Sequence, residues 1–477
     1  MNTTAIGAAT PFVNTGGGPL LVPLEIGHPS HMAVVDPDTA YWAIVRKDRL
    51  ADLLTGSNVV QDYRQRMEEC ATEMDQLRFG LKPSAVYFNP TDRCNLDCSY
   101  CYIPRDMRRG GEHMTETRLL ESLGLLRDYF SRHMPRGRRP RVIFHGAEPL
   151  LNFKAVRAGI HAFKDEFLFG VQTNATLLDD ATLDFLTTHQ VSIGLSLDGP
   201  TAEINNRTRK GWQGPGTVHQ SVLHAMERLR GYPGYSVIVT ITRENVEMLS
   251  SVVELLHAHG VPGCLLNATR CTLPGAREVR VGDEELAGPF IRALERNDEL
   301  FHQTGHKMVV ANFANILLAI LAPTARRLMC DISPCGGGRA FFALAANGDL
   351  FPCSEFIGLE SFCGGNLFRE GIDQAMASPA FATVTGRNVD RFNPCGRCAI
   401  RHYCGSPCPA EAHEMNGGMD QIGAFCHFYE EQVRYAFRLI ADGRANDFLW
   451  QDWDAADGME TVIDFSGSIT GSSLHMA

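Results

Sequence analysis

The chain has 477 residues, a formal net charge of −11 and a sequence pI of about 5.9. Apolar residues make up 44% and charged residues 21%, so the chain can form a large hydrophobic core and is not expected to be disordered. The acidic balance disfavours a nucleic-acid partner, and no apolar run approaches the roughly 18 residues of a membrane span. The N-terminus lacks the features of a signal peptide. We therefore expect a cytoplasmic protein without a membrane partner.

The first part of the chain is predicted to be an extension over residues 1–27 followed by a small α+β segment over residues 28–80. Within this segment "HMAVVDPDTAYWAIV" alternates well enough for a hairpin or three short strands. Helical periodicity then follows over residues 48–56 and 58–77.

Residues 84–305 alternate between strand-like runs and helical patterns. Six strand–helix units predict an α/β fold with a parallel sheet, an incomplete (β/α)6 version of the eight-stranded barrel. The strand-like runs lie at 86–90, 141–145, 168–173, 191–197, 235–241 and 263–267.

The loops after these strands are polar and distinctive. They read "NPTDRC", "HGAEP", "QTNAT", "SLDGP", "TREN" and "NATR". In barrels of this kind the chemistry lies on the loops that follow the C-terminal strand ends. We therefore expect the active site at this edge of the sheet.

The rest of the chain divides into three predicted parts. An apolar stretch indicates a linking helix over residues 306–329. A cysteine-rich domain follows over residues 330–445, and its Asn-Gly pair between two apolar runs predicts a β-hairpin. Residues 446–477 are polar and acidic and are expected to form a C-terminal tail.

Three of the fifteen cysteines, Cys94, Cys98 and Cys101, follow the spacing C-x3-C-x2-C. In a reducing compartment such clustering indicates metal or iron–sulfur ligation and not disulfides. A four-iron cube takes four thiolates, so three cysteines leave one iron open to a small chelating molecule. The alternative is a structural zinc site that lacks its fourth ligand. The position of the loop after the first barrel strand favours the iron–sulfur cluster.

The stretch "CNLDCSYCY" resembles the signature of radical S-adenosylmethionine (SAM) enzymes, including the aromatic Tyr100 before the third cysteine. In that family the amine and carboxylate of SAM chelate the open iron. One electron then cleaves the sulfonium and releases a 5′-deoxyadenosyl radical, which abstracts hydrogen from the substrate. The resemblance implies that the cofactor supplies the chemistry and that the protein positions it and excludes water.

Further loops resemble the SAM-binding motifs of the same family. "FHGAEPLL" is similar to a Gly-Gly-Glu-Pro motif that contacts the SAM ammonium, with Ala147 where the second glycine usually stands. Three further stretches resemble the segments that contact the methionyl, ribose and carboxylate groups of SAM: "QTNATLL", "LSLDGP" and "INNRTRKG". The resemblance implies that Arg207 binds the SAM carboxylate, because a guanidinium can bind a carboxylate with two hydrogen bonds. The implied cofactor-binding residues are Tyr100, Gly146, Ala147, Glu148, Gln172, Asn174, Ser196 and Arg207.

Eight later cysteines resemble the SPASM domain, a C-terminal extension of radical SAM enzymes that modify peptides and proteins. The resemblance implies two auxiliary [4Fe–4S] clusters, which makes three clusters in all; a pair of zinc knots is the alternative. Four thiolates on each auxiliary cluster would leave no open iron, so an electron path or a structural role is expected. The implied ligands are Cys330, Cys335, Cys353 and Cys408 for auxiliary cluster I, and Cys395, Cys398, Cys404 and Cys426 for auxiliary cluster II.

The same resemblance implies a peptide or protein substrate and a reductant such as flavodoxin or ferredoxin. One branch of the family oxidises a Cys or Ser of sulfatases to formylglycine and carries an Asp directly after the cysteine that matches Cys353. Here Ser354 stands at that position and Glu355 follows. Serine is a poor base, so the sulfatase reaction is disfavoured and Glu355 becomes the candidate catalytic proton acceptor.

Residues 28–80 weakly resemble small winged-helix domains that bind the leader of a ribosomal peptide along an exposed strand edge. Packing of this segment on the barrel is an equally good interpretation. We favour a maturase that forms a thioether or carbon–carbon crosslink in a short ribosomal peptide. The alternatives are a formylglycine-forming protein maturase, an iron–sulfur electron-transfer or sensor protein, and a radical SAM enzyme for a small molecule. An electron carrier would not need Glu148 or Gln172 at strand ends.

Overall fold

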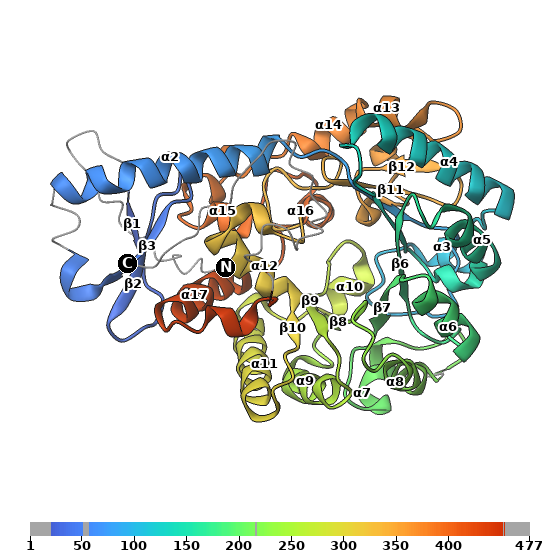
Figure 1. The fold of residues 1–477 in the computed structure, drawn as a ribbon, viewed down its shortest axis with the longest axis horizontal. Coiled ribbons are helices and arrows are strands. Elements are labelled where there is room, and N and C mark those ends of the chain that lie inside the picture. Colours follow the sequence, from blue (N-terminus) through green and yellow to red (C-terminus); the bar gives the residue numbers. More distant parts are fainter. Residues whose placement is uncertain (1–20, 51–56, 215–216, 452, 454–477) are drawn as a thin grey trace.

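The computed structural model describes residues 21–50, 57–214, 217–451 and 453. A ten-stranded sheet forms its centre, and a separate three-stranded sheet lies at one end of the molecule (Figure 1). No helix among the described residues is long and apolar enough to span a membrane.

The central part of the large sheet consists of six parallel strands in chain order. Each lies at one of the six predicted strand positions, so the predicted alternation is confirmed. The strands are β4 (Ala85–Phe88), β5 (Arg141–Phe144), β6 (Leu168–Thr173), β7 (Ser192–Ser196), β8 (Tyr235–Ile241) and β9 (Gly263–Ala268).

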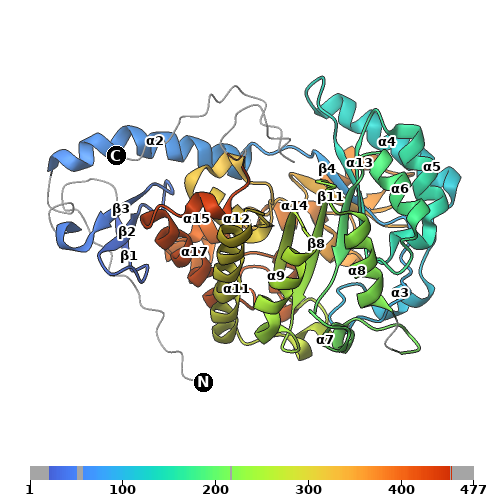
Figure 2. The ribbon, with the colours of Figure 1, turned by 60° about the horizontal axis from the view of Figure 1, so that its bottom comes forward.

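Helices cover the outer face of these strands (Figure 2). In the first of them, Thr115 caps the N-terminus by accepting a hydrogen bond from a backbone N–H. Its buried residues Leu119, Leu123, Leu126 and Phe130 lie on one face at helical spacing. The covering helices are α4 (Glu116–His133), α5 (Phe153–Phe163), α6 (Asp180–Thr188), α8 (Val218–Arg228), α9 (Leu249–Ala258) and α11 (Asp283–Thr304).

The cysteine-rich region continues the same sheet. β11 (Phe341–Leu344) pairs in parallel with β4, and β12 (Asp349–Phe351) pairs antiparallel with β11. β13 (Gly365–Asn366) ends the sheet on this side, and β10 (Val309–Val310) beside β9 ends it on the other. The sheet of the described residues therefore stays open, as an incomplete barrel requires.

The predicted hairpin is confirmed. Gly348 between β11 and β12 has φ +94°, a left-handed conformation that glycine adopts without strain. A Cβ at this position would lie 2.6 Å from the ring of Phe368.

The linking helix is shorter than the predicted 306–329. Val309–Val310 pair with β9, so α12 (Ala311–Leu321) begins only after them. The helix ends before Pro323, because the residue that precedes a proline is pushed out of the helical region.

The N-terminal segment is an antiparallel sheet of β1 (Val22–Leu24), β2 (His31–Val35) and β3 (Trp42–Arg46). The predicted boundary at residue 28 is therefore too late, because β1 lies before it. α2 (Ser57–Phe79) confirms the helix predicted at 58–77. Of the helix predicted at 48–56, a short 3-10 turn covers Lys47–Arg49, and residues 51–56 lie outside the described residues.

This small sheet contacts the C-terminal half of the chain. The indole N–H of Trp42 donates to the backbone oxygen of Ile320 in α12 at 2.7 Å. The hydroxyl of Tyr403 donates to the backbone oxygen of Ala40 at 2.7 Å. The small sheet therefore packs on the body of the protein, and Leu24, Ile26, Ala33 and Val35 belong to the same buried hydrophobic cluster as the barrel residues.

The remaining helices are short, except for the one that follows Cys426. They are α3 (Arg105–Gly110), α7 (Ala202–Thr208), α10 (Pro274–Val279), α13 (Gly371–Met376), α14 (Pro379–Thr385), α15 (Arg401–Cys404), α16 (Pro409–Asn416) and α17 (Cys426–Ala441).

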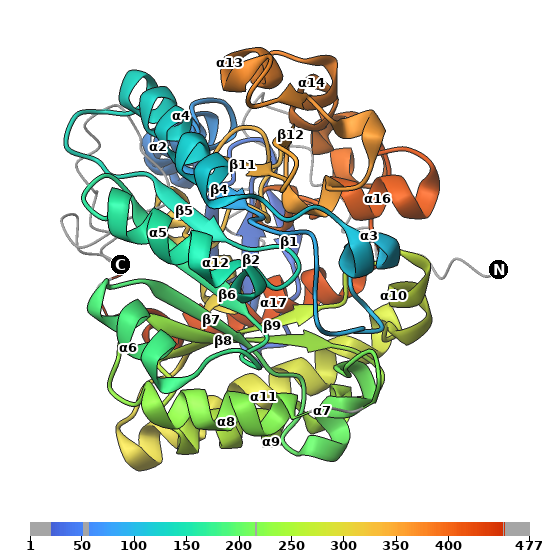
Figure 3. The same ribbon diagram turned by 90° about the vertical axis from the view of Figure 1, so that its right-hand side faces the viewer.

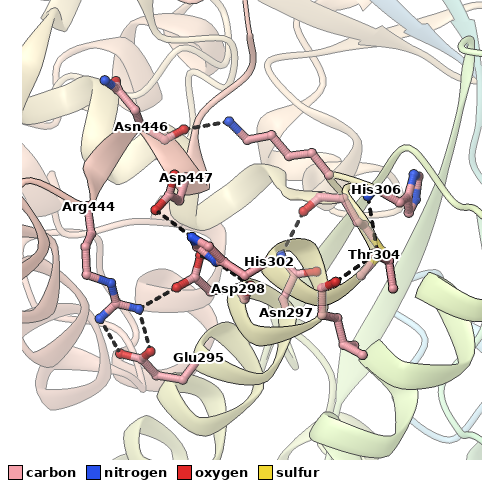
Figure 4. Close-up of polar contacts among 12 residues, drawn as sticks. Glu295, Asn297, Asp298, His302, Thr304, His306, Arg444, Asn446 and Asp447 are labelled. Carbon is pink, nitrogen blue, oxygen red and sulfur yellow. Dashed lines mark hydrogen bonds and ion pairs between the residues drawn. The ribbon is translucent and has the colours of Figure 1, made fainter.

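The predicted tail begins too early, because residues just after 446 belong to the packed body. Phe448 and Leu449 are buried, while residues 454–477 lie outside the described part. Nearby, Arg444 donates to Glu295 at 2.7 Å and to Asp298 at 2.5 Å, which fastens the end of the chain to α11 (Figure 4).

Asp298 also stands near His302 and Asp447, in the one group of three possible metal ligands within 4.8 Å among the described residues. The guanidinium of Arg444 already supplies the positive charge that Asp298 needs. We therefore interpret this cluster as an ion-pair network that holds the C-terminus and not as a metal centre.

Arg78 joins the end of α2 to the cysteine-rich region. Its side chain is buried and donates to the backbone oxygen of Ser333 at 2.8 Å, to Asp390 at 2.6 Å and to Asn388 at 2.9 Å. We predict that Arg78→Ala lowers the free energy of unfolding by about 3 kcal/mol, because it leaves buried acceptors without their donor. Anaerobic urea unfolding measures this change.

The matched control is Arg46→Ala, which removes an exposed ion pair with Asp48. It should leave the urea midpoint unchanged. Equal midpoints for the two variants would contradict the anchoring role of Arg78.

Candidate active site

The first three cysteines lie in a loop of residues 94–101, the cysteine loop, which follows β4 at its C-terminal end. The backbone N–H of Cys94 donates to the oxygen of Arg108 at 2.9 Å, and that of Cys101 donates to the oxygen of Cys98 at 3.3 Å. The N–H of Leu96 points at the sulfur of Cys94 at 3.4 Å. The loop thus turns its thiols to the inside and holds its own backbone in place.

Residues 208–212, the cover segment, run along the cysteine loop. The N–H groups of Ser99 and Asp97 donate to the oxygens of Thr208 and Lys210 at 3.1 and 2.8 Å. The indole N–H of Trp212 donates to the backbone oxygen of Cys94 at 2.9 Å. A segment more than 100 positions later in the chain therefore fixes the path of the cysteines.

Burial disfavours the charged form of the thiols in the cysteine loop. Burial raises the pKa of Cys98 to about 12, and burial together with the charge of Glu148 raises the pKa of Cys94. Burial raises the pKa of Cys101 as well. Thiolates at this place need a cation to stabilise them, which a bound metal group supplies.

The fifteen cysteines are all free thiols, so those of the cysteine loop are available as ligands. Three thiolates from one loop can hold three irons of a four-iron cube and leave the fourth iron open.

Gly146 and Glu148 shape the loop after β5. Gly146 has φ +100°, and a Cβ there would lie 2.2 Å from the side chain of Asn89, so this position tolerates only glycine. The fully buried carboxylate of Glu148 accepts from Thr173 at 2.8 Å and from the backbone N–H of Asn174 at 2.8 Å. It therefore ties the end of β5 to the end of β6. Ala147 lies between these two residues.

Two more predicted residues lie at the end of β6, and Asn174 is the one that reaches a cysteine. The side-chain amide of Asn174 donates to Asn95 at 2.8 Å and lies 4.0 Å from the sulfur of Cys94. Gln172 hydrogen-bonds to His145, whose pKa is lowered to about 4 by burial.

Tyr100 belongs to a buried polar network. Its hydroxyl donates to Asp198 at 2.5 Å, and Arg209 donates to the same carboxylate oxygen at 2.8 Å. The backbone N–H of Thr240 satisfies the other oxygen at 2.9 Å. Asp198 is fully buried, so the loop after β7 is locked to the cysteine loop through a paired charge.

Arg207 is not brought to this network. It is exposed on α7 and pairs with Glu203 at 3.1 Å and Glu244 at 3.6 Å. The guanidinium beside Tyr100 is that of Arg209, 5.5 Å from the ring centre. Both arginines stand in "INNRTRKG", and the sequence offered no means to tell the buried one from the exposed one. Ser196 lies at the end of β7, as predicted.

The eight later cysteines include two groups in which neighbouring thiols raise the pKa of one member. Burial raises the pKa of Cys330, and the charges of Cys335 and Cys353 raise it further. The pKa of Cys404 is raised in the same way, by burial and then by Cys398, Cys426 and Cys395. Backbone N–H groups point at the sulfurs of Cys335 and Cys408, each at 3.4 Å.

Glu355 lies near both the cysteine loop and the later cysteines, and Arg270 lies beside it. Burial raises the pKa of Glu355 to about 7, and one of its carboxylate oxygens is buried without a hydrogen-bond partner. Its charge contributes to the raised pKa of Cys101 and to that of Cys353. Arg270 follows β9 and is surrounded by Glu355, Glu411 and Cys408. Arg270 ends the polar loop "NATR", but nothing in the sequence distinguished it as a residue of the site.

The chain matches the Radical SAM superfamily over residues 88–256 and the SPASM iron-sulfur cluster-binding domain over residues 335–399. It is 37% identical over 413 residues to an uncharacterized protein of Archaeoglobus fulgidus, which covers 87% of this chain and 93% of that protein. It is 22% identical to the cysteine-type anaerobic sulfatase-maturating enzyme of Clostridium perfringens, over 76% of this chain and 98% of the relative. It is 24% identical to the mycofactocin maturase MftC of Mycobacterium tuberculosis, over 71% and 81%.

Two solved structures share the fold. Native anSMEcpe with bound AdoMet superposes with a TM-score of 0.64 at 17% identity, over 76% of this chain and 100% of that one. Streptococcus suis SuiB bound to its precursor peptide SuiA superposes with a TM-score of 0.55 at 12% identity, over 83% and 96%.

Glu148 gives a pH-dependent prediction. Burial raises its pKa to about 7 from 4.5, so its contribution to stability is complete below about pH 4.5 and is lost as the pH rises through about 7. Between about pH 5 and about pH 8 the wild type should lose about 2 kcal/mol of unfolding free energy relative to Glu148→Gln. Urea unfolding of both proteins at the two pH values measures this difference.

The control is Glu227→Gln. Arg230 lowers the pKa of Glu227, so the contribution of that carboxylate is lost only as the pH falls through its folded-state pKa, below this interval. A difference for Glu148→Gln no larger than for the control would contradict the buried, raised-pKa carboxyl group.

Proposed function

Because this chain belongs to the radical SAM superfamily and carries a SPASM domain, we propose that it is a maturase that modifies a ribosomally made peptide, most simply by forming a thioether or carbon–carbon crosslink. The observation that carries the proposal is the arrangement of buried groups around two sets of thiols. The cysteine loop lies at the C-terminal strand ends, and Glu355 lies near both it and the later cysteines.

The donor set fits SAM on a three-cysteine cluster. Cys94, Cys98 and Cys101 would hold the cluster, and the buried carboxylate of Glu148 stands at the end of β5 where an ammonium group could pair with it. When bound and reduced by one electron, this cofactor pair supplies a 5′-deoxyadenosyl radical that takes a hydrogen atom from the substrate. Hydrogen bonds between the cysteine loop and the cover segment hold the loop in the position that the cofactor pair would need.

The chain's own polar residues orient these groups. Tyr100, Asp198 and Arg209 form a network that needs no further partner and fixes the loop after β7. Asn174 sits against Cys94 and Asn95 and closes the β6 side. Arg209 is buried beside the cysteines and pairs with Asp198, whereas Arg207, predicted to bind the SAM carboxylate, is exposed.

We assign the later cysteines to two auxiliary [4Fe–4S] clusters, with Cys330, Cys335, Cys353 and Cys408 on the first and Cys395, Cys398, Cys404 and Cys426 on the second. The first group is supported by the charges of Cys335 and Cys353, which raise the pKa of Cys330. The second is supported by the neighbouring cysteines that raise the pKa of Cys404. Coordinatively complete clusters suit the removal of an electron from a substrate radical or a structural role.

The cluster assignment predicts iron contents. Reconstituted wild type should hold about twelve irons, and the triple variant of Cys94, Cys98 and Cys101 to Ala about eight, because one cube is lost. Anaerobic iron assay with electron paramagnetic resonance of the reduced protein measures both. Cys363→Ala, which lies outside the three assigned groups, should keep about twelve. About four irons in the wild type would contradict the auxiliary clusters.

The names of similar proteins and a free strand edge of this structure both support a peptide substrate. Named relatives include a mycofactocin maturase, and the fold neighbour SuiB was solved with its precursor peptide. Within the described residues β3 pairs only with β2, so its other edge presents the backbone groups to which an extended leader could add a strand. We propose this edge as the leader-binding site.

Co-expression with the short open reading frames beside the gene tests the substrate. We expect one peptide to lose two hydrogens, with fragment masses missing between the two crosslinked residues. Deletion of residues 21–46 should abolish the change while 5′-deoxyadenosine still forms in the presence of dithionite. An unchanged peptide set together with 5′-deoxyadenosine formation would contradict the ribosomal-peptide proposal.

Oxidation of a single Ser or Cys to formylglycine is the second candidate, favoured by the position of Glu355. The buried carboxyl group has a pKa of about 7 and lies next to Cys353, which suits a proton acceptor. If the two lost hydrogens map to one residue, Glu355→Gln should reduce the modification strongly while Ser354→Ala should not.

A further inference from the structure

A basic aromatic patch covers the outside of the cysteine loop. The guanidinium carbons of Arg109, Arg108 and Arg105 lie 4.7, 5.4 and 5.5 Å from the ring centre of Trp212. The two outer arginines belong to α3 and are exposed, while Arg108 is buried. Figure 3 shows α3 at the surface of the molecule. Cation–π contacts of this kind hold the indole in one orientation.

Trp212 also connects this surface to the first cysteine. Its indole N–H donates to the backbone oxygen of Cys94 at 2.9 Å. The patch is therefore one hydrogen bond away from the residue whose sulfur is proposed to ligate the cluster. Most other groups around the cysteine loop, such as Asp198 and Glu148, are buried and out of reach of a protein partner.

The charge of the patch is opposite to that of the whole chain. The chain carries a net charge of −11, yet exposed Arg93, Arg109 and Lys210 lie on or beside the cysteine loop and the cover segment. Asp97 is already neutralised by Arg105 at 2.6 Å and Arg108 at 3.0 Å. Positive charge gathered beside the cysteine loop attracts an acidic partner to this face.

We propose that Trp212 with Arg105 and Arg109 is the docking surface for a small acidic one-electron carrier protein, which reduces the cluster at the cysteine loop. The inference rests on the proposed function, since it needs that cluster. The carrier is oxidised by one electron and the cluster is reduced by one, and no covalent bond of this chain forms or breaks in the step.

Two other uses of the patch fit the structure less well. A leader peptide would use the strand edge of β3, which belongs to the small sheet on the opposite side of the molecule from α3 (Figure 1). A purely structural stack would not need Arg109, because Arg108 is the buried member that also bonds to Asp97 and to the backbone of the loop. Arg109 adds exposed positive charge to the ring.

The test uses a reduced bacterial flavodoxin as the probe and the reconstituted full-length enzyme. We expect flavodoxin to bind the wild type more tightly at about 50 mM than at about 300 mM salt, because screening weakens a charged interface. Arg109→Glu should raise the Kd about fivefold or more at low salt. Lys154→Glu, an equal charge reversal at an exposed lysine of α5, should leave the Kd unchanged. Titration calorimetry gives these values without enzyme turnover.

A second measurement follows electron delivery. In stopped flow, flavodoxin should reduce the cluster of Arg109→Glu about fivefold more slowly at subsaturating concentration, while dithionite, which needs no docking surface, should reduce wild type and variant at the same rate. Equal Kd values for Arg109→Glu and Lys154→Glu would overturn the proposal. Failure of dithionite to yield 5′-deoxyadenosine from SAM would instead contradict the proposed function itself.

Discussion

The parallel pairing of β11 with β4 is the contact on which the arrangement of the whole site depends. It joins a strand of the cysteine-rich region to the strand that leads into the cysteine loop, with Leu344 opposite Phe88 at their ends. The strand that leads into the cysteine loop and the hairpin that precedes Cys353 thereby belong to one continuous sheet. Their relative position is fixed by backbone hydrogen bonds, which resist displacement better than a side-chain interface does.

Inside the barrel, two buried carboxylates hold the loops at the strand ends together. Glu148 accepts hydrogen bonds from the end of β6, and Asp198 accepts them from Tyr100, Arg209 and β8. Each buried carboxylate is costly to desolvate, and donors that come from neighbouring loops help to stabilise it. The loops can therefore keep their positions only together, which explains why the polar residues of several strand ends form one connected group.

Much of the fold could be predicted from the sequence because it depends on local periodicity. The six barrel strands, the hairpin at Gly348 and α2 all follow from alternation, helical spacing or an Asn-Gly turn. The cysteine spacing likewise indicated an iron–sulfur enzyme, and its family is confirmed by the comparisons. These features need only neighbouring residues to be recognised.

What sequence reasoning missed depends on contacts between distant residues. Nothing local distinguishes Arg209 from Arg207, since only the fold decides which guanidinium meets Asp198. The continuation of the sheet through β11, the early β1 and the packed residues after 446 have the same cause. The stretch "ANDFLW" does not by itself show that the ring of Phe448 will pack against Phe313 of α12 and Tyr435 of α17.

The pairing of the cysteine loop with the cover segment has a consequence for synthesis on the ribosome. Cys94, Cys98 and Cys101 leave the exit tunnel before Thr208 and Trp212 exist, so for that interval their thiols have no lid. Domains fold largely in the order in which they emerge, so the cysteine loop has to wait for more than 100 further residues before the hydrogen bonds that fix its path can form.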